Sequence, residues 1–179
     1  EIKMGYVIPN NTFRTYKSRN LYSFVFERAK LLSHSRDSKV GLIVQISSVS
    51  TPSMETMCKE IKTDISHGWI SNYATRPSYL FDGVCMNLTI IIESINPDCS
   101  NKRLFSTNYI RWTPDSRGYL FNNLRFIEFD DKTLYFNYSL PKLTSQIENR
   151  LIHKLINEQH PILEYLSANK TKTKEELFY

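Results

Sequence analysis

The first clear pattern of hydrophobic and polar positions predicts an amphipathic helix over residues 20–32. Apolar side chains recur there at roughly helical spacing, while Glu27, Arg28 and Lys30 supply the polar face. The apolar positions are Leu21, Phe24, Val25, Ala29, Leu31 and Leu32. We therefore expect these apolar residues to face the core of the protein.

The pattern that follows predicts a strand and a second helix. Residues 40–46 form a continuous apolar run, typical of a strand covered on both faces. Thr51-Pro52 can provide the N-cap and first turn of a helix that continues to about Asp64. The apolar face of this helix is predicted to consist of Met54, Met57, Cys58 and Ile61.

Two further strands are predicted at residues 69–73 and 86–93, separated by turns. Because they are close in sequence, we expect them to be antiparallel neighbours at one edge of a sheet. The first helix and strand would extend a parallel core. The order of elements therefore predicts an α/β fold with a mixed sheet.

The composition changes near residues 95–101 and becomes aromatic and basic beyond them. This change predicts three parts: an α/β part at 1–97, a connector at 98–145 and a helical region with a polar tail at 146–179. The connector carries Tyr109, Arg111, Trp112, Arg117, Tyr119, Phe121, Arg125 and Phe126, and a turn at Asp130-Asp131. The amphipathic helix at 146–158 is expected to bury Ile147, Leu151, Leu155 and Ile156.

Composition and charge narrow the class of protein. The chain has 179 residues, 41% of them hydrophobic, and a formal net charge of +5, which is typical of a globular protein rather than a disordered one. No two of its 5 glycines form a G-x-G loop. Its 3 cysteines lie too far apart for a C-x-x-C pair, which favours free thiols in a reducing compartment. No apolar run reaches the roughly 18 residues of a membrane span.

The sequence contains no complete catalytic or metal-binding motif. The four histidines lack metal-ligand spacing, and no serine lies in a G-x-S-x-G elbow. Asp130-Asp131 is followed by Lys132-Thr133, which is more typical of a turn than of a catalytic pair. We therefore predict no catalytic residue and no metal site in this chain.

An ordered series of short motifs resembles the region after the catalytic N-P-P-Y tetrapeptide in bacterial DNA adenine-N6 methyltransferases of the type IIG restriction–modification kind. In that family an "NLY–F–ER" helix precedes a "G–IVP–S" strand, a helix, a "Y–RP–LF–G" turn and a "LTI–I" strand. The matching residues are Asn20-Leu21-Tyr22 with Glu27-Arg28, Gly41-Leu42-Ile43-Val44 with Ser47-Ser48, Tyr73, Arg76-Pro77, Leu80-Phe81, Gly83 and Leu88-Thr89-Ile90. Tyr109-Ile110-Arg111-Trp112 is similar to the linker before the family's target recognition domain.

The resemblance implies the C-terminal half of a Rossmann-like class I methyltransferase domain and the start of a connector to a target recognition domain. It implies a parent enzyme that transfers a methyl group from S-adenosylmethionine to adenine N6 in double-stranded DNA. The Gly-rich cofactor loop and the N-P-P-Y tetrapeptide are absent, and Gln45-Ile46 replaces the proline of the strand motif. We therefore expect a fragment that begins just after the tetrapeptide and is inactive alone.

The resemblance also implies a role for Phe81, which matches the aromatic position that stacks on the flipped adenine. Such stacking replaces part of the base stacking that is lost on extrusion from the duplex. From the pattern alone, a buried core aromatic is the other interpretation.

Arg76, Arg111 and Arg117 are the predicted DNA-binding residues, and Ser47, Ser48 and Tyr73 the predicted cleft residues. The alternatives are a surface salt bridge for Arg76, solvated arginines around an aromatic core for Arg111 and Arg117, and helix capping for the serines. We further expect a bacterial cytoplasmic location, no membrane contact and self-association through an exposed sheet edge. A non-catalytic DNA-binding module and a structural domain of an unrelated α/β enzyme remain alternative functions.

Overall fold

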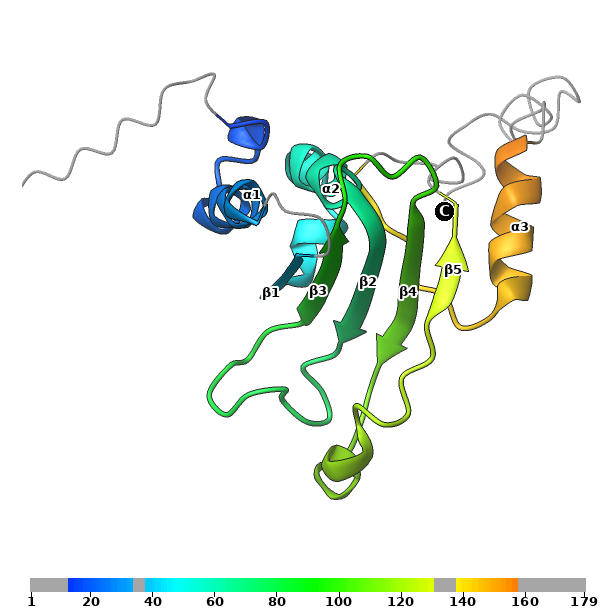
Figure 1. Ribbon diagram of the computed structural model, residues 1–179. Coiled ribbons are helices and arrows are strands. Elements are labelled where there is room, and N and C mark those ends of the chain that lie inside the picture. The colour runs from blue at the N-terminus through cyan, green and yellow to red at the C-terminus, as the bar shows by residue number, and fades with distance from the viewer. Residues whose placement is uncertain (1–12, 34–37, 131–137, 158–179) are drawn as a thin grey trace, which may run out of the picture.

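The computed structural model describes residues 13–33, 38–130 and 138–157, which form a five-stranded sheet with helices beside it (Figure 1). The helices are α1 (Leu21–Leu32), α2 (Glu55–Ile61) and α3 (Gln146–Asn157), and the strands are β1 (Lys39–Gln45), β2 (Ile65–Tyr73), β3 (Leu88–Ile95), β4 (Arg103–Ile110) and β5 (Ile127–Phe129). Short 3-10 helices are η1 (Tyr16–Ser18), η2 (Ile46–Val49), η3 (Pro52–Met54) and η4 (Pro114–Tyr119). Most of the predicted turn at 130–133 and the polar tail beyond 157 lie outside the described residues.

The sheet is mixed, as predicted, with strand order β1-β3-β2-β4-β5. β3 is antiparallel to both β1 and β2, and β4 is parallel to β2. The predicted antiparallel pairing of β2 with β3 is confirmed, but their position at the edge is wrong. β3 lies between β1 and β2, and β4 pairs with the other side of β2. Both β2 and β3 are therefore interior strands.

β4 and β5 come from the segment predicted to be a connector. The predicted boundary at residue 97 therefore does not coincide with a break in the sheet. The pattern gave no strand signal because β4 has the sequence RLFSTNYI, which mixes polar and apolar residues on both faces. Its pairing with β2 is interrupted between Ile70 and Asn72, where the Asn72 N–H donates to Thr107 Oγ1 at 3.1 Å.

One face of the sheet packs against α1 and α2. Phe26 of α1 joins Met57, Cys58 and Ile61 of α2 in a core with the inward residues of the strands. The predicted apolar face of the second helix is thus confirmed, and Met54 is also buried. On the other face Ile43 and Ile92 are 47% and 45% exposed. The prediction that residues 40–46 are covered on both faces is therefore wrong within the described part of the chain.

Helix α1 lies where the pattern predicts it, but two residues of its predicted polar face are buried and several of its predicted apolar face are exposed. Glu27 and Lys30 are 2% and 3% exposed, whereas Leu21 and Leu32 are each 73% exposed. The carboxylate of Glu27 accepts hydrogen bonds at 2.8 Å from the backbone N–H groups of Arg14 and Thr15. Burial of this carboxylate is thus compensated by the chain segment that precedes the helix.

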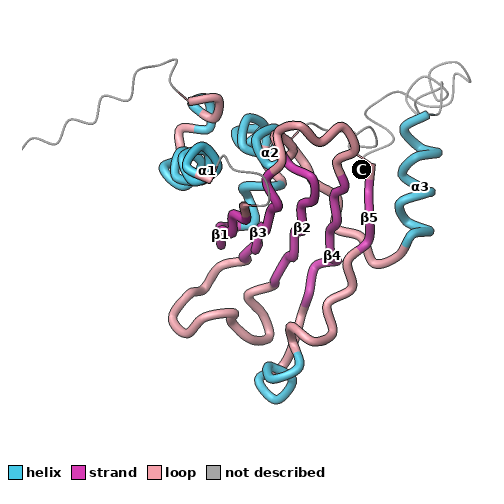
Figure 2. Tube along the Cα trace, viewed as in Figure 1, coloured by secondary structure: helices cyan, strands magenta, loops and turns pink. Residues whose placement is uncertain are grey.

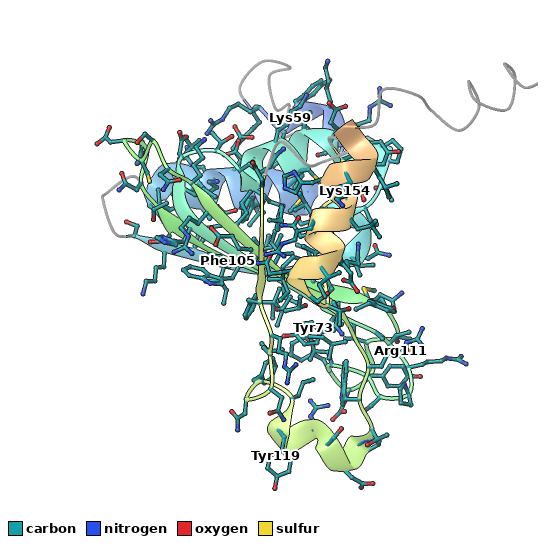
Figure 3. The ribbon with its side chains drawn as sticks, turned by 90° about the vertical axis from the view of Figure 1, so that its right-hand side faces the viewer. Lys59, Tyr73, Phe105, Arg111, Tyr119 and Lys154 are labelled. Atoms are coloured by element: carbon teal, nitrogen blue, oxygen red, sulfur yellow. The ribbon has the colours of Figure 1, made fainter. Side chains whose placement is uncertain are left out.

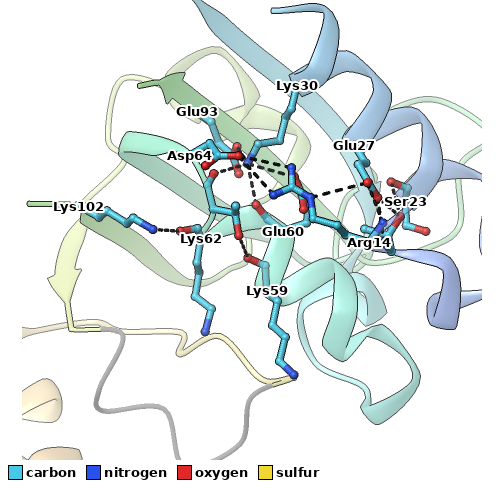
Figure 4. Close-up of polar contacts among 12 residues, drawn as sticks. Arg14, Ser23, Glu27, Lys30, Lys59, Glu60, Lys62, Asp64, Glu93 and Lys102 are labelled. Carbon is cyan, nitrogen blue, oxygen red and sulfur yellow. Dashed lines mark hydrogen bonds and ion pairs between the residues drawn. The ribbon is translucent and has the colours of Figure 1, made fainter. Parts of the chain in front are cut away.

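Lys30 joins α1 to the sheet and to α2 (Figure 4). Its ammonium lies 2.8 Å from a carboxylate oxygen of Glu93 on β3 and 3.9 Å from Glu60 on α2. It also donates to the backbone carbonyls of Glu60 at 2.6 Å and Thr63 at 2.8 Å. Three elements therefore meet at one buried cation.

Helix α3 also exposes its predicted apolar face. Ile147, Leu151 and Leu155 are 75%, 55% and 64% exposed. The helix contacts β5 through Asn149, whose amide donates to the Glu128 carbonyl at 3.1 Å, and Ile152 packs against the core. The prediction that its apolar residues are buried is therefore wrong for these three positions.

Candidate nucleic-acid interface

The carboxyl ends of β1, β2 and β4 lie at the same end of the sheet. Leu88, the first residue of β3, pairs with Gln45 of β1 on one side and with Tyr73 of β2 on the other, and Tyr73 pairs with Ile110 of β4. The loops at 74–87 and 111–126 extend together from this end of the sheet (Figure 2). Open α/β sheets bind their ligands beyond the carboxyl ends of their strands.

The two loops form one lobe because they share a small apolar core. This core consists of Tyr73, Leu80, Leu88, Trp112 and Leu120. The rings of Tyr73 and Trp112 meet edge to face with centroids 6.0 Å apart. Figure 3 shows Tyr73 in the same part of the molecule as Arg111 and Tyr119. Tyr73 is 1% exposed, and burial raises the pKa of its hydroxyl. Tyr73 therefore organises the lobe, and its predicted position in an open cleft is wrong.

Arg117 connects the two loops directly. Its guanidinium donates to the backbone carbonyls of Tyr79 at 3.0 Å and Leu80 at 2.8 Å. These contacts precede Phe81 in the chain, so Arg117 holds the loop that carries Phe81. DNA binding by Arg117 stays a prediction, and its contacts define it as a positioning residue.

Phe81 lies at the surface of this loop and is 41% exposed. The Val84 N–H donates to its carbonyl at 3.2 Å, which closes a turn around Asp82 and Gly83. Gly83 has a φ of +78°, a conformation that glycine adopts without steric cost. The interpretation of Phe81 as a core aromatic is therefore wrong, and its ring is available to a ligand.

Arg76 and Arg111 line one open pocket of about 620 Å³, although they belong to different loops. No acidic residue is among the residues that line it. The loop of Arg76 is held by Asn87, whose side-chain oxygen accepts a hydrogen bond from the Thr75 N–H at 2.9 Å. Arg111 lies with its guanidinium carbon 5.8 Å from the Tyr109 ring centroid. Two of the predicted DNA-binding residues thus converge on one basic pocket.

The two predicted cleft serines have structural contacts. Ser48 is fully buried, and its hydroxyl donates to the Gln45 carbonyl at 2.6 Å. The Ser47 carbonyl accepts a hydrogen bond from Thr51 Oγ1 at 2.9 Å. Ser48 therefore closes the turn after β1 and its prediction as a cleft residue is wrong, while Ser47 is half-buried in the same turn.

A second pocket adjoins the first because Arg111 lines both. It has a volume of about 330 Å³ and includes Trp112, Tyr119 and Arg125. The alternation of aromatic and basic residues in the predicted connector indicated a DNA-facing surface, but it did not define a pocket. The walls come from β4, η4 and residues 143–144, which are far apart in sequence.

The described residues do not form a cradle for S-adenosylmethionine. Gly41 and Gly68 lie within strands, and Gly83 and Gly118 have no heavy atom within 4 Å of the position a Cβ would take. None of them lies in a G-x-G turn between a strand and a helix, which is the geometry of a Gly-rich cofactor loop. We derive no chemical step through this cofactor from these residues.

Residues 13–33, 38–130 and 138–157 contain no group of three or more His, Cys, Asp or Glu side chains arranged to hold a metal ion. Within these ranges, no helix has the length and apolar character needed to cross a membrane.

Comparison with known proteins gives weak structural likenesses. No family model matches the sequence, and no curated protein matches it significantly. The DNA complex of DrdV aligns over 63% of this chain and 12% of its own, with 12% identity and a TM-score of 0.44. The Type ISP restriction-modification enzyme LlaGI, in a nuclease-deletion form with a DNA substrate mimic, gives the same coverage, 13% identity and a TM-score of 0.44.

The ATP-dependent Type ISP restriction-modification enzyme LlaBIII, bound to DNA, aligns over 55% of this chain and 8% of its own, with 15% identity and a TM-score of 0.40. This chain thus spans about an eighth or less of the length of these proteins. Likenesses of this strength do not establish a shared function.

Proposed function

We propose that this chain is a DNA-binding part of a restriction–modification adenine-N6 methyltransferase and supplies the wall on which the flipped adenine stacks. One observation carries the proposal: Arg76 and Arg111 line one pocket at the carboxyl end of β2 and β4, and Phe81 is exposed on the same loop as Arg76. The ordered motifs in the sequence support the same family. The mixed sheet is compatible with the class I methyltransferase fold that this resemblance implies.

Each exposed residue has a physical task in this function. Extruding a base from a duplex costs a few kcal/mol, and stacking on an aromatic side chain returns about 1–3 kcal/mol per base. Phe81 can provide that stacking because its ring is accessible and its loop is fixed by Arg117. Arg76 and Arg111 can contact backbone phosphates and so hold the duplex beside the ring.

Methyl transfer itself is assigned to the parent enzyme rather than to the described residues. S-adenosylmethionine would supply the methyl group, and residues outside the described part would have to bind it. We expect this chain to incorporate no methyl group into DNA when it is incubated with radiolabelled S-adenosylmethionine. Incorporation above the level of a protein-free control would contradict this assignment.

The stacking role is tested by replacing Phe81 and measuring DNA affinity. Fluorescence anisotropy compares a fully paired duplex with one that carries a single unpaired adenine, which costs less to extrude. We expect Phe81→Ala to weaken binding to the unpaired-adenine duplex by about 5- to 150-fold, the equivalent of 1–3 kcal/mol. Phe81→Trp should retain binding because it preserves the stacking surface.

Tyr16→Ala is the matched control, because Tyr16 is also an exposed aromatic but belongs to η1. Equal affinity of wild type and Phe81→Ala for the unpaired-adenine duplex would refute the stacking role. Failure of the wild-type chain to bind either duplex would refute DNA binding.

A non-catalytic DNA-binding module is the second candidate function. The basic pocket of Arg76 and Arg111 supports it equally, because phosphate contacts hold DNA without any chemistry on the base. Both candidate functions predict DNA binding by this chain, and they differ only in whether the parent protein methylates DNA. The upstream coding sequence distinguishes the two, because only the methyltransferase requires the Gly-rich loop and the Asn-Pro-Pro-Tyr tetrapeptide.

A further inference from the structure

The second pocket of the lobe, here called the Trp112 pocket, has the composition of a nucleotide site. It is lined by Asn108, Arg111, Trp112, Tyr119, Asn123 and Arg125, together with apolar residues. Its lining contains two arginines and no acidic residue. A volume of about 330 Å³ lies at the lower end of the range for small-ligand sites, which favours one nucleotide unit over a larger ligand.

Trp112 forms part of the wall of this pocket. The residue is 5% exposed, and its indole Nε1–H is buried with no hydrogen-bond partner among the described residues. The ring packs edge to face on Tyr73, so the wall that it forms is fixed in the apolar core of the lobe. Trp112 is therefore placed to report on a ligand in the pocket.

The remaining groups match the other parts of a nucleotide. Leu120 and Leu124 offer an apolar surface for a base, and the amides of Asn108 and Asn123 can both donate to and accept from its edge. Arg111 and Arg125 carry the guanidinium groups that recognise phosphate. Because Arg111 also lines the pocket of Arg76, the two pockets adjoin at this side chain.

We propose that the Trp112 pocket binds one nucleotide of the DNA strand, with its phosphate on Arg111 and Arg125 and its base against Leu120 and Leu124. This inference deepens the proposed function and rests on it. It assigns a site distinct from the Phe81 ring, because Phe81 does not line this pocket.

Tryptophan fluorescence tests the site directly. The chain has 2 tryptophans, so Trp69→Phe leaves Trp112 as the only reporter. In this background, titration of the full chain with dAMP should quench the fluorescence in a saturable manner. Arg125→Gln should weaken dAMP binding by at least tenfold. Arg28→Gln, which removes one exposed positive charge from α1, should leave it unchanged.

Further measurements distinguish nucleotide binding from simple phosphate binding, and they test this pocket separately from the proposed function. Equal quenching by inorganic phosphate would overturn the nucleotide site in favour of a simple anion site. Absence of quenching by dAMP, or quenching unaffected by Arg125→Gln, would overturn it as well. Binding of the duplexes by anisotropy is measured on the same preparations. Duplex binding without dAMP binding refutes only this pocket, whereas dAMP binding without duplex binding refutes the proposed function.

Discussion

Arg117 shows how a single side chain determines the position of a candidate binding residue that it does not touch. It comes from η4, and its two hydrogen bonds end on Tyr79 and Leu80 of the preceding loop. Both acceptors are backbone carbonyls, so the geometry depends on the planar fork of the guanidinium rather than on its charge alone. A lysine at this position could not make the same pair of contacts.

Replacement of Arg117 should therefore loosen the Phe81 loop without unfolding the sheet. We expect Arg117→Met to lower stability by about 1 kcal/mol, the typical net contribution of such hydrogen bonds. Hydrogen exchange at the Val84 amide, which bonds to the Phe81 carbonyl, should become faster in this variant. Arg28→Gln serves as the control, and unchanged exchange at Val84 would refute the positioning role.

Helix α1 shows that an element can be correctly predicted and yet be oriented by its polar residues. Lys30 lies buried between Glu93 and Glu60, and Glu27 binds the backbone before the helix. Burial raises the pKa of Glu93 to about 8, because the loss of hydration outweighs the attraction of Lys30. Burial raises the pKa of Glu60 as well. The helix is thus held by groups that respond to pH.

The raised pKa of Glu93 predicts how stability depends on pH. Between the ordinary pKa of a glutamate and about 8, the folded state keeps a proton that the unfolded state has lost. Stability is therefore expected to fall as pH rises from 5 to 8, by at most about 1.4 kcal/mol per unit for one proton. Urea unfolding at several pH values measures this slope.

Glu93→Gln separates the contribution of this carboxyl from those of other groups. The amide is nearly isosteric and cannot ionise, so the fall in stability between pH 5 and 8 should become shallower. An identical slope in wild type and variant would show that Glu93 does not hold the proton. The remaining slope in the variant would then report Glu60 and other groups.

The whole molecule leaves one strand edge and one sheet face without partners among the described residues. β1 pairs only with β3, and the face opposite α1 and α2 exposes Ile43 and Ile92. Exposed edges are templates for pairing with another chain. The basic lobe consists of the loops that follow β2 and β4 and includes no residue of β1, so different substitutions test DNA binding and edge pairing.

Self-association through β1 is therefore a prediction at the scale of the molecule. Light scattering coupled to size-exclusion chromatography should detect a dimer whose fraction grows with protein concentration. Ile43→Lys should reduce that fraction, because a charged side chain on an edge strand opposes pairing. Leu32→Lys, at an exposed position of α1, is the matched control. Monomer alone at every concentration would refute the prediction.

The sequence by itself determined the kind and approximate place of several elements. Periodicity predicted α1, α2 and α3, and apolar runs predicted β1, β2 and β3, because these signals depend on neighbours a few residues apart. It also identified Phe81, Arg76 and Arg111, which the structure finds exposed at one end of the sheet. Their convergence follows from the shared direction of β2 and β4.

Only the tertiary structure decided which faces are buried and which residues are free to bind. The insertion of β3 between β1 and β2, the pairing of β4 with β2 and the contact of Arg117 with Leu80 join residues far apart in sequence. The buried face of α1 was likewise decided by partners on other elements, since Lys30 meets Glu93. Local periodicity reflects the spacing of side chains along the chain but not the partners that compensate for their burial. For this reason the sequence did not show that Ser48 and Tyr73 are buried or that Phe81 is exposed.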